Sequence, residues 1–167
     1  PTIEIFTERA QKKNIALYSF IDPGLPSSIS GDPLRIKQVL VNLLSNAIKF
    51  TPEEGRIFVE IARAEGDGSG CDIRFSVRDT GIGIPERKRK LIFEAFTQAD
   101  STVTRRYGGT GLGLSISSNL ISLMGSSLEL ESMPGRGSTF HFTLRLKRCE
   151  PGKTHGLPGD FRAIIHS

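Results

Sequence analysis

The run from Asp32 to Thr51 constrains the fold more than any other part of the sequence. Its apolar residues recur at spacings of three and four, which is typical of a helix with one buried face. Asp32 followed by Pro33 is a strong helix start, and Pro52 stops the helix after Thr51. We therefore predict a long amphipathic helix whose apolar face consists of Ile36, Val39, Leu40, Leu43, Leu44, Ala47 and Ile48.

Two β-hairpins are predicted after this helix. In the first, Arg56–Arg63 and Cys71–Asp79 alternate apolar and polar residues on either side of the linker AEGDGSG. In the second, Ser127–Glu131 and Ser138–Leu146 flank the turn MPGRG. Strands that pair mainly as hairpins, combined with helices, predict an α+β fold: a two-layer sandwich with a mixed, mostly antiparallel sheet and helices on one face.

The remaining predicted elements are a strand and three helices. The strand is expected at Ile15–Ile21 and the helices at Thr2–Lys13, Glu86–Ala95 and Gly111–Met124. The irregular run FTQADSTVTRRYGG is long for a loop inside a compact domain, and such loops are usually functional or disordered. In the last helix we expect four residues to face the core: Leu112, Ile116, Leu120 and Leu123.

The composition bounds the class of protein. The 167 residues suit one domain, which we place at residues 1–148, with 149–167 as a linker or disordered tail. The sequence has no apolar run long enough to span a bilayer, no initiator Met and no signal-peptide pattern. We therefore expect a cytoplasmic segment of a longer protein. Aromatic residues make up only 7% with no Trp, so no nucleic-acid partner is expected despite the net charge of +4. Cys71 and Cys149 have no metal-ligand spacing and are expected to be ordinary thiols.

A polar stripe runs along the predicted long helix. Arg35, Gln38, Asn42, Asn46 and Lys49 fall on one side of it at roughly 100° per residue. The amide oxygen of Asn46 is a suitable ligand for Mg²⁺, which takes few protein oxygens and completes its shell with phosphate and water. The ammonium of Lys49 suits phosphate oxygens. The alternative interpretation is an ordinary solvated helix face.

The motif DTGIGIP, residues 79–85, places a carboxylate at the end of a predicted strand. Gly81 and Gly83 follow Asp79 and would let a ligand lie flat against the backbone. An ionised aspartate only accepts hydrogen bonds, so it would bind the exocyclic amine of adenine and repel the carbonyl of guanine. The alternative interpretation is a turn capped by the aspartate.

The stretch RRYGGTGLGLSI, residues 105–116, has four glycines in six residues directly before a predicted helix. It lacks the lysine of a Walker loop and does not follow a strand directly, so it is neither a P-loop nor a Rossmann loop. A helix N-terminus offers free N–H groups and a positive dipole to phosphate, and Arg105 and Arg106 lie beside it in sequence. We expect a mobile lid that cradles phosphate; a hinge alone is the alternative.

Five motifs occur in the order and spacing of one known family. DPLRIKQVLVNLLSNAIKFT, DTGIGIP, FEAFTQAD, YGGTGLGLSI and GRGSTF resemble those of the ATP-binding catalytic domain of sensor histidine kinases, over Thr2 to Leu146. The FTQAD stretch is most similar to that of hybrid sensor kinases. The resemblance implies the Bergerat fold shared with gyrase, Hsp90 and MutL, and it implies ATP and Mg²⁺ as ligands.

The resemblance also implies roles for the residues at matching positions. Asn46 would bind Mg²⁺ and Lys49 would contact phosphate, with Arg105 or Arg106 at the γ-phosphate, and these four residues would carry the catalysis. Thr139 would supply a hydroxyl near the adenine. The nucleotide site would also include Asn42, Phe50, Asp79 at the adenine, Gly81, Gly83, Ile84, Phe96 (which with Phe93 anchors the lid), Tyr107, Gly109, Thr110, Gly111, Leu112 and Gly113.

Two departures from related proteins shape the expected reaction. The hydrolysing members of this superfamily carry a glutamate one helical turn before the metal-binding asparagine, and here that position is Asn42. An amide cannot take up a proton at neutral pH, so we expect ATP to be bound but hydrolysed poorly. The family's phosphoacceptor histidine motif is also missing from this sequence, in which His141, His155 and His166 are expected to be ordinary polar residues.

We therefore predict the catalytic ATP-binding domain of a hybrid sensor histidine kinase. It would donate the γ-phosphoryl group of Mg²⁺-ATP to a histidine on a dimerisation domain outside this chain, with a response regulator or receiver domain downstream. The chain by itself is expected to be monomeric. Two alternatives stay open: a degenerate module that binds nucleotide or a partner kinase without transferring phosphate, and an ATPase of the wider superfamily.

Overall fold

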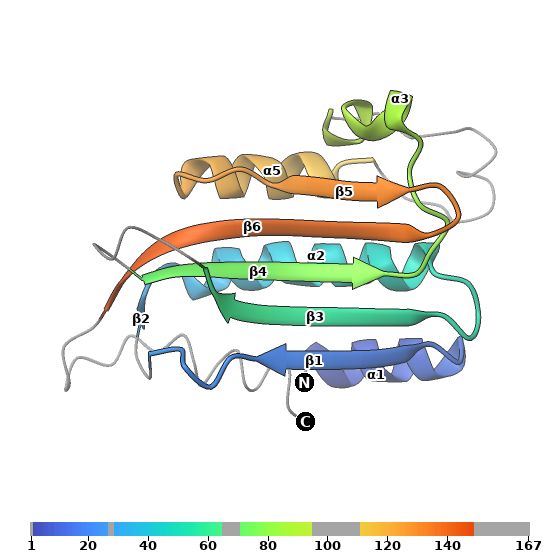
Figure 1. Cartoon of the computed structure of the whole chain (residues 1–167), viewed down its shortest axis with the longest axis horizontal. Helices are drawn as coiled ribbons and strands as arrows, with labels where there is room; N and C mark the ends of the chain where they lie inside the picture. The colour runs from blue at the N-terminus through green and yellow to red at the C-terminus, as the bar shows by residue number, and fades with distance from the viewer. Residues whose placement is uncertain (1, 27–28, 65–70, 95–110, 149–167) are drawn as a thin grey trace.

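The computed structural model describes residues 2–26, 29–64, 71–94 and 111–148. These residues form two layers, with helices on one face of a six-stranded sheet (Figure 1). The predicted α+β sandwich is thereby confirmed. None of the described helices is long and apolar enough to cross a membrane. The elements are α1 (Thr2–Lys12), β1 (Ala16–Ile21), β2 (Ile29–Ser30), α2 (Pro33–Phe50), β3 (Arg56–Arg63), β4 (Cys71–Asp79), α3 (Glu86–Arg89), the 3₁₀ turn η1 (Leu91–Phe93), α5 (Gly113–Leu123), β5 (Glu129–Met133) and β6 (Gly137–Arg148).

The sheet is mixed, with the strand order β1-β3-β4-β6-β2 and with β5 also paired to β6. β1 runs parallel to β3, and the other pairs are antiparallel. Both predicted hairpins, β3–β4 and β5–β6, are confirmed. In the register of the sheet, Ser138 of β6 pairs with Asp79 on one side and with Ser132 on the other. The end of β4 therefore lies next to the β5–β6 turn.

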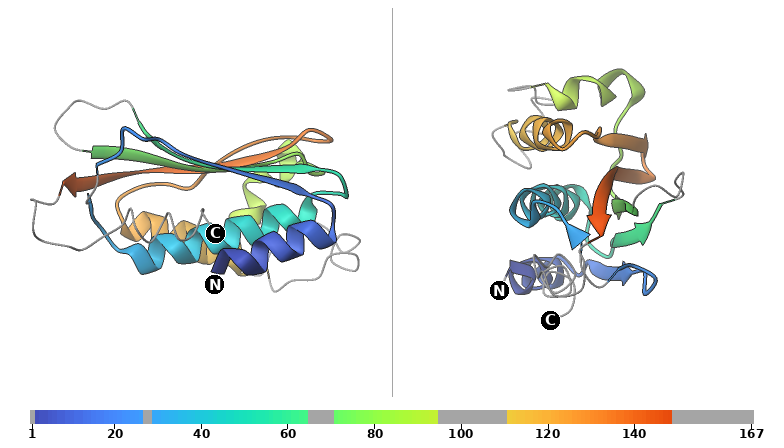
Figure 2. Two further views of the ribbon diagram at one scale, coloured as in Figure 1. Left: turned by 90° about the horizontal axis from the view of Figure 1, so that it is seen from below. Right: turned by 90° about the vertical axis from the view of Figure 1, so that its left-hand side faces the viewer.

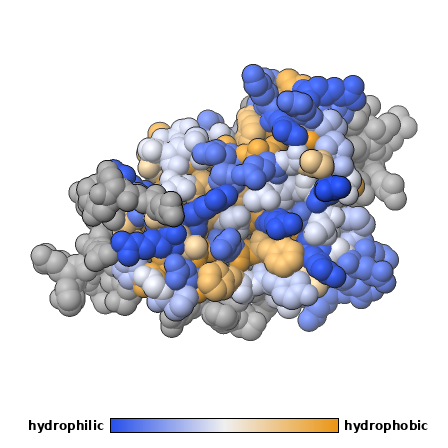
Figure 3. Space-filling view, in the orientation of Figure 1, coloured by the Kyte–Doolittle hydropathy of each residue, from blue (hydrophilic) through white to orange (hydrophobic). Residues whose placement is uncertain are grey.

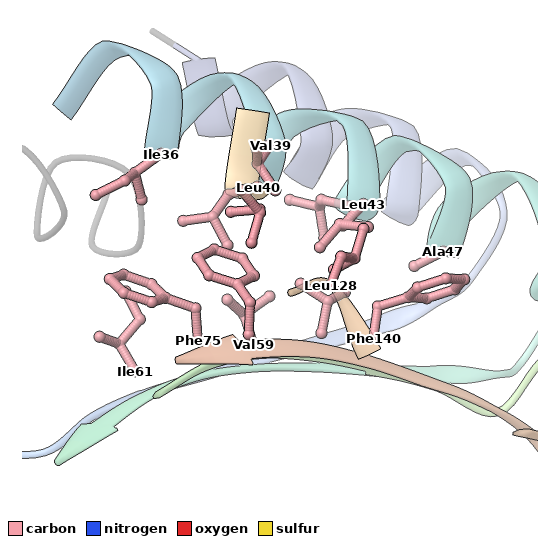
Figure 4. Close-up of a cluster of buried hydrophobic side chains, with 14 of the residues drawn as sticks. Ile36, Val39, Leu40, Leu43, Ala47, Val59, Ile61, Phe75, Leu128 and Phe140 are labelled. Carbon is pink, nitrogen blue, oxygen red and sulfur yellow. The ribbon is translucent and has the colours of Figure 1, made fainter. Parts of the chain in front are cut away.

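The core lies between α2 and the sheet, as the periodicity of α2 predicts (Figure 4). All seven apolar residues of the predicted face are buried. Among the strand residues beneath them, the rings of Phe75 and Phe142 stack with their centroids 4.9 Å apart. Asp32 caps the start of α2, because its side chain accepts a hydrogen bond from the backbone N–H of Arg35 at 3.1 Å. α2 is the central helix, with α1 and α5 on either side of it (Figure 2).

α5 differs from its prediction in both its start and its buried face. The helix begins at Gly113. The expectation that Ile116 and Leu123 face the core is wrong, because these side chains are 44% and 73% exposed. Almost every residue of this helix is apolar or small, so the spacing of apolar residues does not identify one buried face. The small residues also allow α5 to pack close to α2. The buried residues of α5 are Ser115, Ser117 and Ile121.

The segment after the DTGIGIP motif forms less helix than predicted. In place of one helix over Glu86–Ala95, α3 ends at Arg89 and the turn η1 follows. α3 has no buried residue, because its sequence ERKR offers no apolar side chain to pack. η1 is better anchored: Ile92 is buried, and the ring of Phe93 meets that of Phe140 edge-on with centroids 6.4 Å apart.

The sheet face opposite the helices carries mainly hydrophilic residues, with apolar ones among them (Figure 3). On this face the rings of Tyr18 and Phe58 stack at 5.1 Å, and the guanidinium of Arg78 lies 5.9 Å from the centre of the Phe58 ring. Asp72 and Arg145 form an ion pair at 2.9 Å. The ring of Phe58 is thus partly covered by the side chain of Arg78.

A lysine just after α1 caps the C-terminus of α2. The ammonium of Lys13 donates hydrogen bonds to the backbone carbonyls of Ile48, Lys49 and Thr51 at 2.9, 3.2 and 3.1 Å. The last carbonyls of a helix lack partners within the helix and form the negative end of its dipole, so a cation is favourable there. This contact ties the end of α1 to the part of α2 that carries the polar stripe.

Replacing Lys13 with methionine is expected to lower the free energy of unfolding by about 1.5–3 kcal/mol, the usual contribution of hydrogen bonds to a charged group. Methionine keeps an unbranched side chain but offers no donor. The matched control is Lys12→Met. In the described part of the chain, the ion pair formed by the Lys12 ammonium is with the exposed carboxylate of Glu8, at 2.7 Å. That control should leave stability close to that of the wild type, because both side chains of this pair are exposed. Chemical denaturation measures both variants, and equal stabilities would contradict the capping role of Lys13.

Candidate nucleotide-binding site

The C-terminal half of the polar stripe on α2 is partly shielded from water. Asn42, Asn46, Lys49 and Phe50 are all half-buried. The ammonium of Lys49 lies 5.0 Å from the centre of the Phe50 ring, and burial lowers the pKa of Lys49. Residues three apart on a helix are neighbours, so Asn46 and Lys49 present an amide and a cation side by side. This is the pair of groups expected for a metal-bound phosphate.

Asp79 lies at the end of β4, on the side of the sheet that faces the helices. The residue is 7% exposed, and the backbone N–H of Gly81 donates a hydrogen bond to its Oδ1 at 2.7 Å. Burial raises the pKa of Asp79, and the backbone N–H groups of Gly81 and Ser138 oppose this shift because they stabilise the carboxylate. A carboxylate has about four lone-pair directions, so Asp79 can still accept a hydrogen bond from a ligand.

The loop after Asp79 is bound to the end of α2. The N–H of Ile82 donates to the carbonyl of Phe50 at 3.3 Å. Gly81 passes so close to the same carbonyl that a Cβ on it would lie 2.6 Å from the oxygen. These contacts bring the DTGIGIP loop, which begins at Asp79, to the end of α2 that bears Lys49.

The other side of the DTGIGIP loop is bound to the β5–β6 hairpin. The N–H of Ile84 donates to the hydroxyl of Ser132 at 2.8 Å. Gly83 has a φ of +68° and lies directly against the carbonyl of Met133, so a side chain here would be strained and would overlap the backbone. The loop is therefore held from two sides, by α2 and by the hairpin.

The hydroxyl group beside Asp79 belongs to Ser138, and not to Thr139 as predicted. Ser138 pairs with Asp79 in the sheet, is buried, and has its hydroxyl 2.9 Å from that of Ser132. Successive residues of a strand face opposite sides of the sheet, so Thr139 lies on the opposite face, where its register partner is Arg78. Ser132 and Ser138 thus lie beside the end of β4 at Asp79, and the sequence analysis named neither of them.

The glycine-rich segment leads into the N-terminus of α5, which packs beside α2. Gly111, Leu112 and Gly113 are half-buried there. Leu112, at the N-cap position, makes no side-chain hydrogen bond to the helix. The first N–H groups of a helix lack acceptors within it and can bind an anion. Six other predicted site residues lie outside the described residues: Phe96, Arg105, Arg106, Tyr107, Gly109 and Thr110.

The donor groups of the site fit a magnesium ion that is bound mainly by its nucleotide. Within residues 2–26, 29–64, 71–94 and 111–148, no group of three or more His, Cys, Asp or Glu residues could hold a metal ion. Asn46 offers a neutral oxygen next to Lys49, and Mg²⁺ commonly takes only one or two protein oxygens together with phosphate and water. The residues present therefore suit the metal as a companion of a polyphosphate.

Comparisons with known proteins identify the family of this chain. Residues 31–148 match the family described as "Histidine kinase-, DNA gyrase B-, and HSP90-like ATPase". Sensor protein GacS of Pseudomonas syringae pv. syringae is 42% identical over 98% of this chain and 18% of its own length. Signal transduction histidine-protein kinase BarA of Escherichia coli (strain K12) is 42% identical over 86% of this chain and 16% of its own length. The chain thus spans less than a fifth of the length of these relatives.

Solved structures of sensor kinases share the fold. Full-length ShkA in complex with AMPPNP superimposes with a TM-score of 0.75 at 35% identity, covering 89% of this chain and 29% of ShkA. The catalytic domain of histidine kinase ThkA, in a nucleotide-free form, gives a TM-score of 0.69 at 32% identity over 86% of this chain and 88% of its own. The chain therefore belongs to the family of histidine kinase-, DNA gyrase B- and HSP90-like ATPases, as an ATP-binding catalytic domain of the sensor histidine kinase type.

Proposed function

We propose that this domain binds Mg²⁺-ATP and donates the γ-phosphoryl group to a histidine on a dimerisation domain outside this chain. The observation that carries the proposal is the buried carboxylate of Asp79, held by the Gly81 N–H at 2.7 Å in a loop bound to the end of α2. A buried group that only accepts hydrogen bonds, next to a loop bound to the end of α2 that carries Lys49, suits a ligand with a donor edge and a negative charge. ATP has both, and the related kinase ShkA was solved with AMPPNP.

Each part of the site has a role in this proposal. Asp79 accepts a hydrogen bond from the exocyclic amine of adenine, while the N–H groups of Gly81 and Ser138 keep the carboxylate in place. The phosphates lie between Lys49 and the N-terminal turn of α5, whose charge and free N–H groups stabilise them. Asn46 would hold Mg²⁺, which neutralises charge on the phosphates when bound.

The transfer uses a nucleophile from another domain. A ring nitrogen of the acceptor histidine attacks the γ-phosphorus, the bond from that phosphorus to the β–γ bridging oxygen breaks, and ADP leaves. Arg105 and Arg106 are proposed to stabilise the γ-phosphate during this step. A response regulator or receiver domain is proposed to take the phosphoryl group from the histidine afterwards.

Hydrolysis is expected to be slow because the site lacks a general base at the position of Asn42. The amide of Asn42 cannot take up a proton, and its nitrogen already donates a hydrogen bond to the hydroxyl of Ser117 at 2.8 Å. Phosphoryl transfer depends on positioning and charge stabilisation, so the loss of this base does not prevent transfer to a separate nucleophile.

The proposal is tested by giving the chain labelled Mg²⁺-ATP with and without the dimerisation domain of its parent kinase. We expect ATP binding and little phosphate release by the chain alone, and acid-labile phosphohistidine once the dimerisation domain is added. The control is the same dimerisation domain with its acceptor histidine changed to glutamine. Rapid phosphate release by the chain alone would support an ATPase instead, and binding without phosphohistidine would support a module that does not transfer phosphate.

A further inference from the structure

The side chain of Asn42 joins α2 to α5. Its Nδ2 donates a hydrogen bond to the Oγ of Ser117 at 2.8 Å, across a sequence separation of 75 residues. Ser117 is 2% exposed, so water does not compete for this hydroxyl in the folded protein. A partly buried hydrogen bond therefore connects the polar stripe of α2 to the helix that follows the glycine-rich segment.

The Asn42 amide also packs closely against Gly113, in the first turn of α5. A Cβ built on Gly113 would overlap the Oδ1 of Asn42. Gly113 and Ser117 are four residues apart, so they lie on the same face of the helix, one turn from each other. The amide therefore contacts α5 at two successive turns: at Gly113 with its oxygen and at Ser117 with its nitrogen.

The start of α5 has little side-chain capping of its own. Leu112, at the N-cap, forms no side-chain hydrogen bond to the helix, and the hydroxyl of Ser115 donates to the Leu112 carbonyl at 2.9 Å without leaving α5. Neither contact sets the place of the helix relative to α2. The hydrogen bond between Asn42 and Ser117, in contrast, joins α5 directly to α2.

We propose that Ser117 is a positioning residue for nucleotide binding, which acts through Asn42. By holding the Asn42 amide, Ser117 fixes the N-terminal turn of α5 at a set distance from Asn46 and Lys49. This inference rests on the proposed function, in which that turn and those side chains bind the phosphates from opposite sides. The same geometry gives Asn42 a task other than water activation: it connects the two halves of the phosphate site.

The test compares ATP and AMP binding to Ser117→Ala by calorimetric titration in the presence of Mg²⁺. We expect the Kd for ATP to rise roughly five- to tenfold, the effect of about one lost hydrogen bond, and the Kd for AMP to stay the same. AMP keeps the adenine contact with Asp79 but lacks the β- and γ-phosphates. Ser122→Ala is the matched control, because it removes an exposed serine hydroxyl near the other end of α5; it should leave both affinities unchanged.

A double-mutant cycle with Asn42→Ala separates positioning from a general loss of stability. If Ser117 acts through Asn42, adding Ser117→Ala to Asn42→Ala should weaken ATP binding no further. Additive losses, an equal loss for AMP, or an unchanged Kd for ATP in Ser117→Ala would each overturn the inference. Wild-type protein that binds no ATP would instead overturn the proposed function, so the two failures are distinguishable. Thermal unfolding of each variant confirms that the titrations are made on folded protein.

Discussion

Asp79→Asn is expected to weaken ATP binding roughly a hundredfold or more, because a buried site loses a required acceptor. In the wild type, the N–H groups of Gly81 and Ser138 already donate to the carboxylate. An asparagine has a single side-chain oxygen, so these two backbone donors and the amine of adenine would compete for it. Its NH₂ group would meet at least one of the three donors directly.

The measurement is calorimetric titration of wild type and Asp79→Asn with ATP, ADP and GTP, with and without Mg²⁺. Wild type should bind the adenine nucleotides and reject GTP, and the variant should lose most of this preference because its amide can donate to the carbonyl of guanine. Asp72→Asn is the control: Asp72 lies on the same strand but pairs with Arg145 at 2.9 Å on the opposite face. ATP binding by Asp79→Asn at the wild-type affinity would show that Asp79 does not contact adenine.

The raised pKa of Asp79 predicts how this binding depends on pH. Burial favours the protonated carboxyl, so Asp79 takes up a proton at a higher pH than an exposed aspartate does. ATP affinity should therefore fall as the pH is lowered through this raised pKa, whereas the weak affinity of Asp79→Asn should not show this step. Folding responds with the opposite sign: the free energy of unfolding falls as the pH rises from 3.8, the ordinary value, through the raised pKa.

The elements that the sequence predicts best are those with a strong contrast between their two faces. α2 has seven apolar residues on one face and a polar stripe on the other, and β3 alternates buried and exposed residues along most of its length. α5 lacks this contrast, so its buried face is decided by its neighbours. Ser117 is buried because it meets Asn42, 75 residues away in the sequence, and no local pattern contains that information.

In the candidate site, too, the sequence does not predict contacts between residues that are far apart along the chain. Asp79 and the glycines of its motif could be located from the sequence, although their contacts with ATP stay a proposal. The inward orientation of Ser138 could have been predicted, because alternate residues of a strand face the same side and Ser138 alternates with the core residues Phe140 and Phe142. The GRGSTF motif by itself does not distinguish the hydroxyl of Ser138 from that of its neighbour. Ser132 had no such signal, since its contact with the N–H of Ile84 crosses 48 residues.

Gly83→Ala is expected to lower the free energy of unfolding by about 4 kcal/mol or more, and to weaken ATP binding in whatever protein stays folded. Two costs combine at this position. The φ of +68° disfavours any residue with a Cβ, and that Cβ would overlap the carbonyl of Met133. The overlap pushes the DTGIGIP loop away from the β5–β6 hairpin, to which it is also bound by the N–H of Gly135, which donates to the carbonyl of Ile82 at 2.8 Å.

Gly125→Ala separates these two costs. Gly125 has a similar φ of +80°, but a Cβ there would have no atom within 4 Å, so only the backbone conformation is penalised. It should cost about 1–2 kcal/mol and leave ATP affinity unchanged. Chemical denaturation followed by nucleotide titration tests both variants. If Gly83→Ala is no less stable than Gly125→Ala, the close contact between the DTGIGIP loop and the hairpin does not hold Asp79 in place. The orientation of the Asp79 carboxylate must then depend on the contacts between this loop and α2.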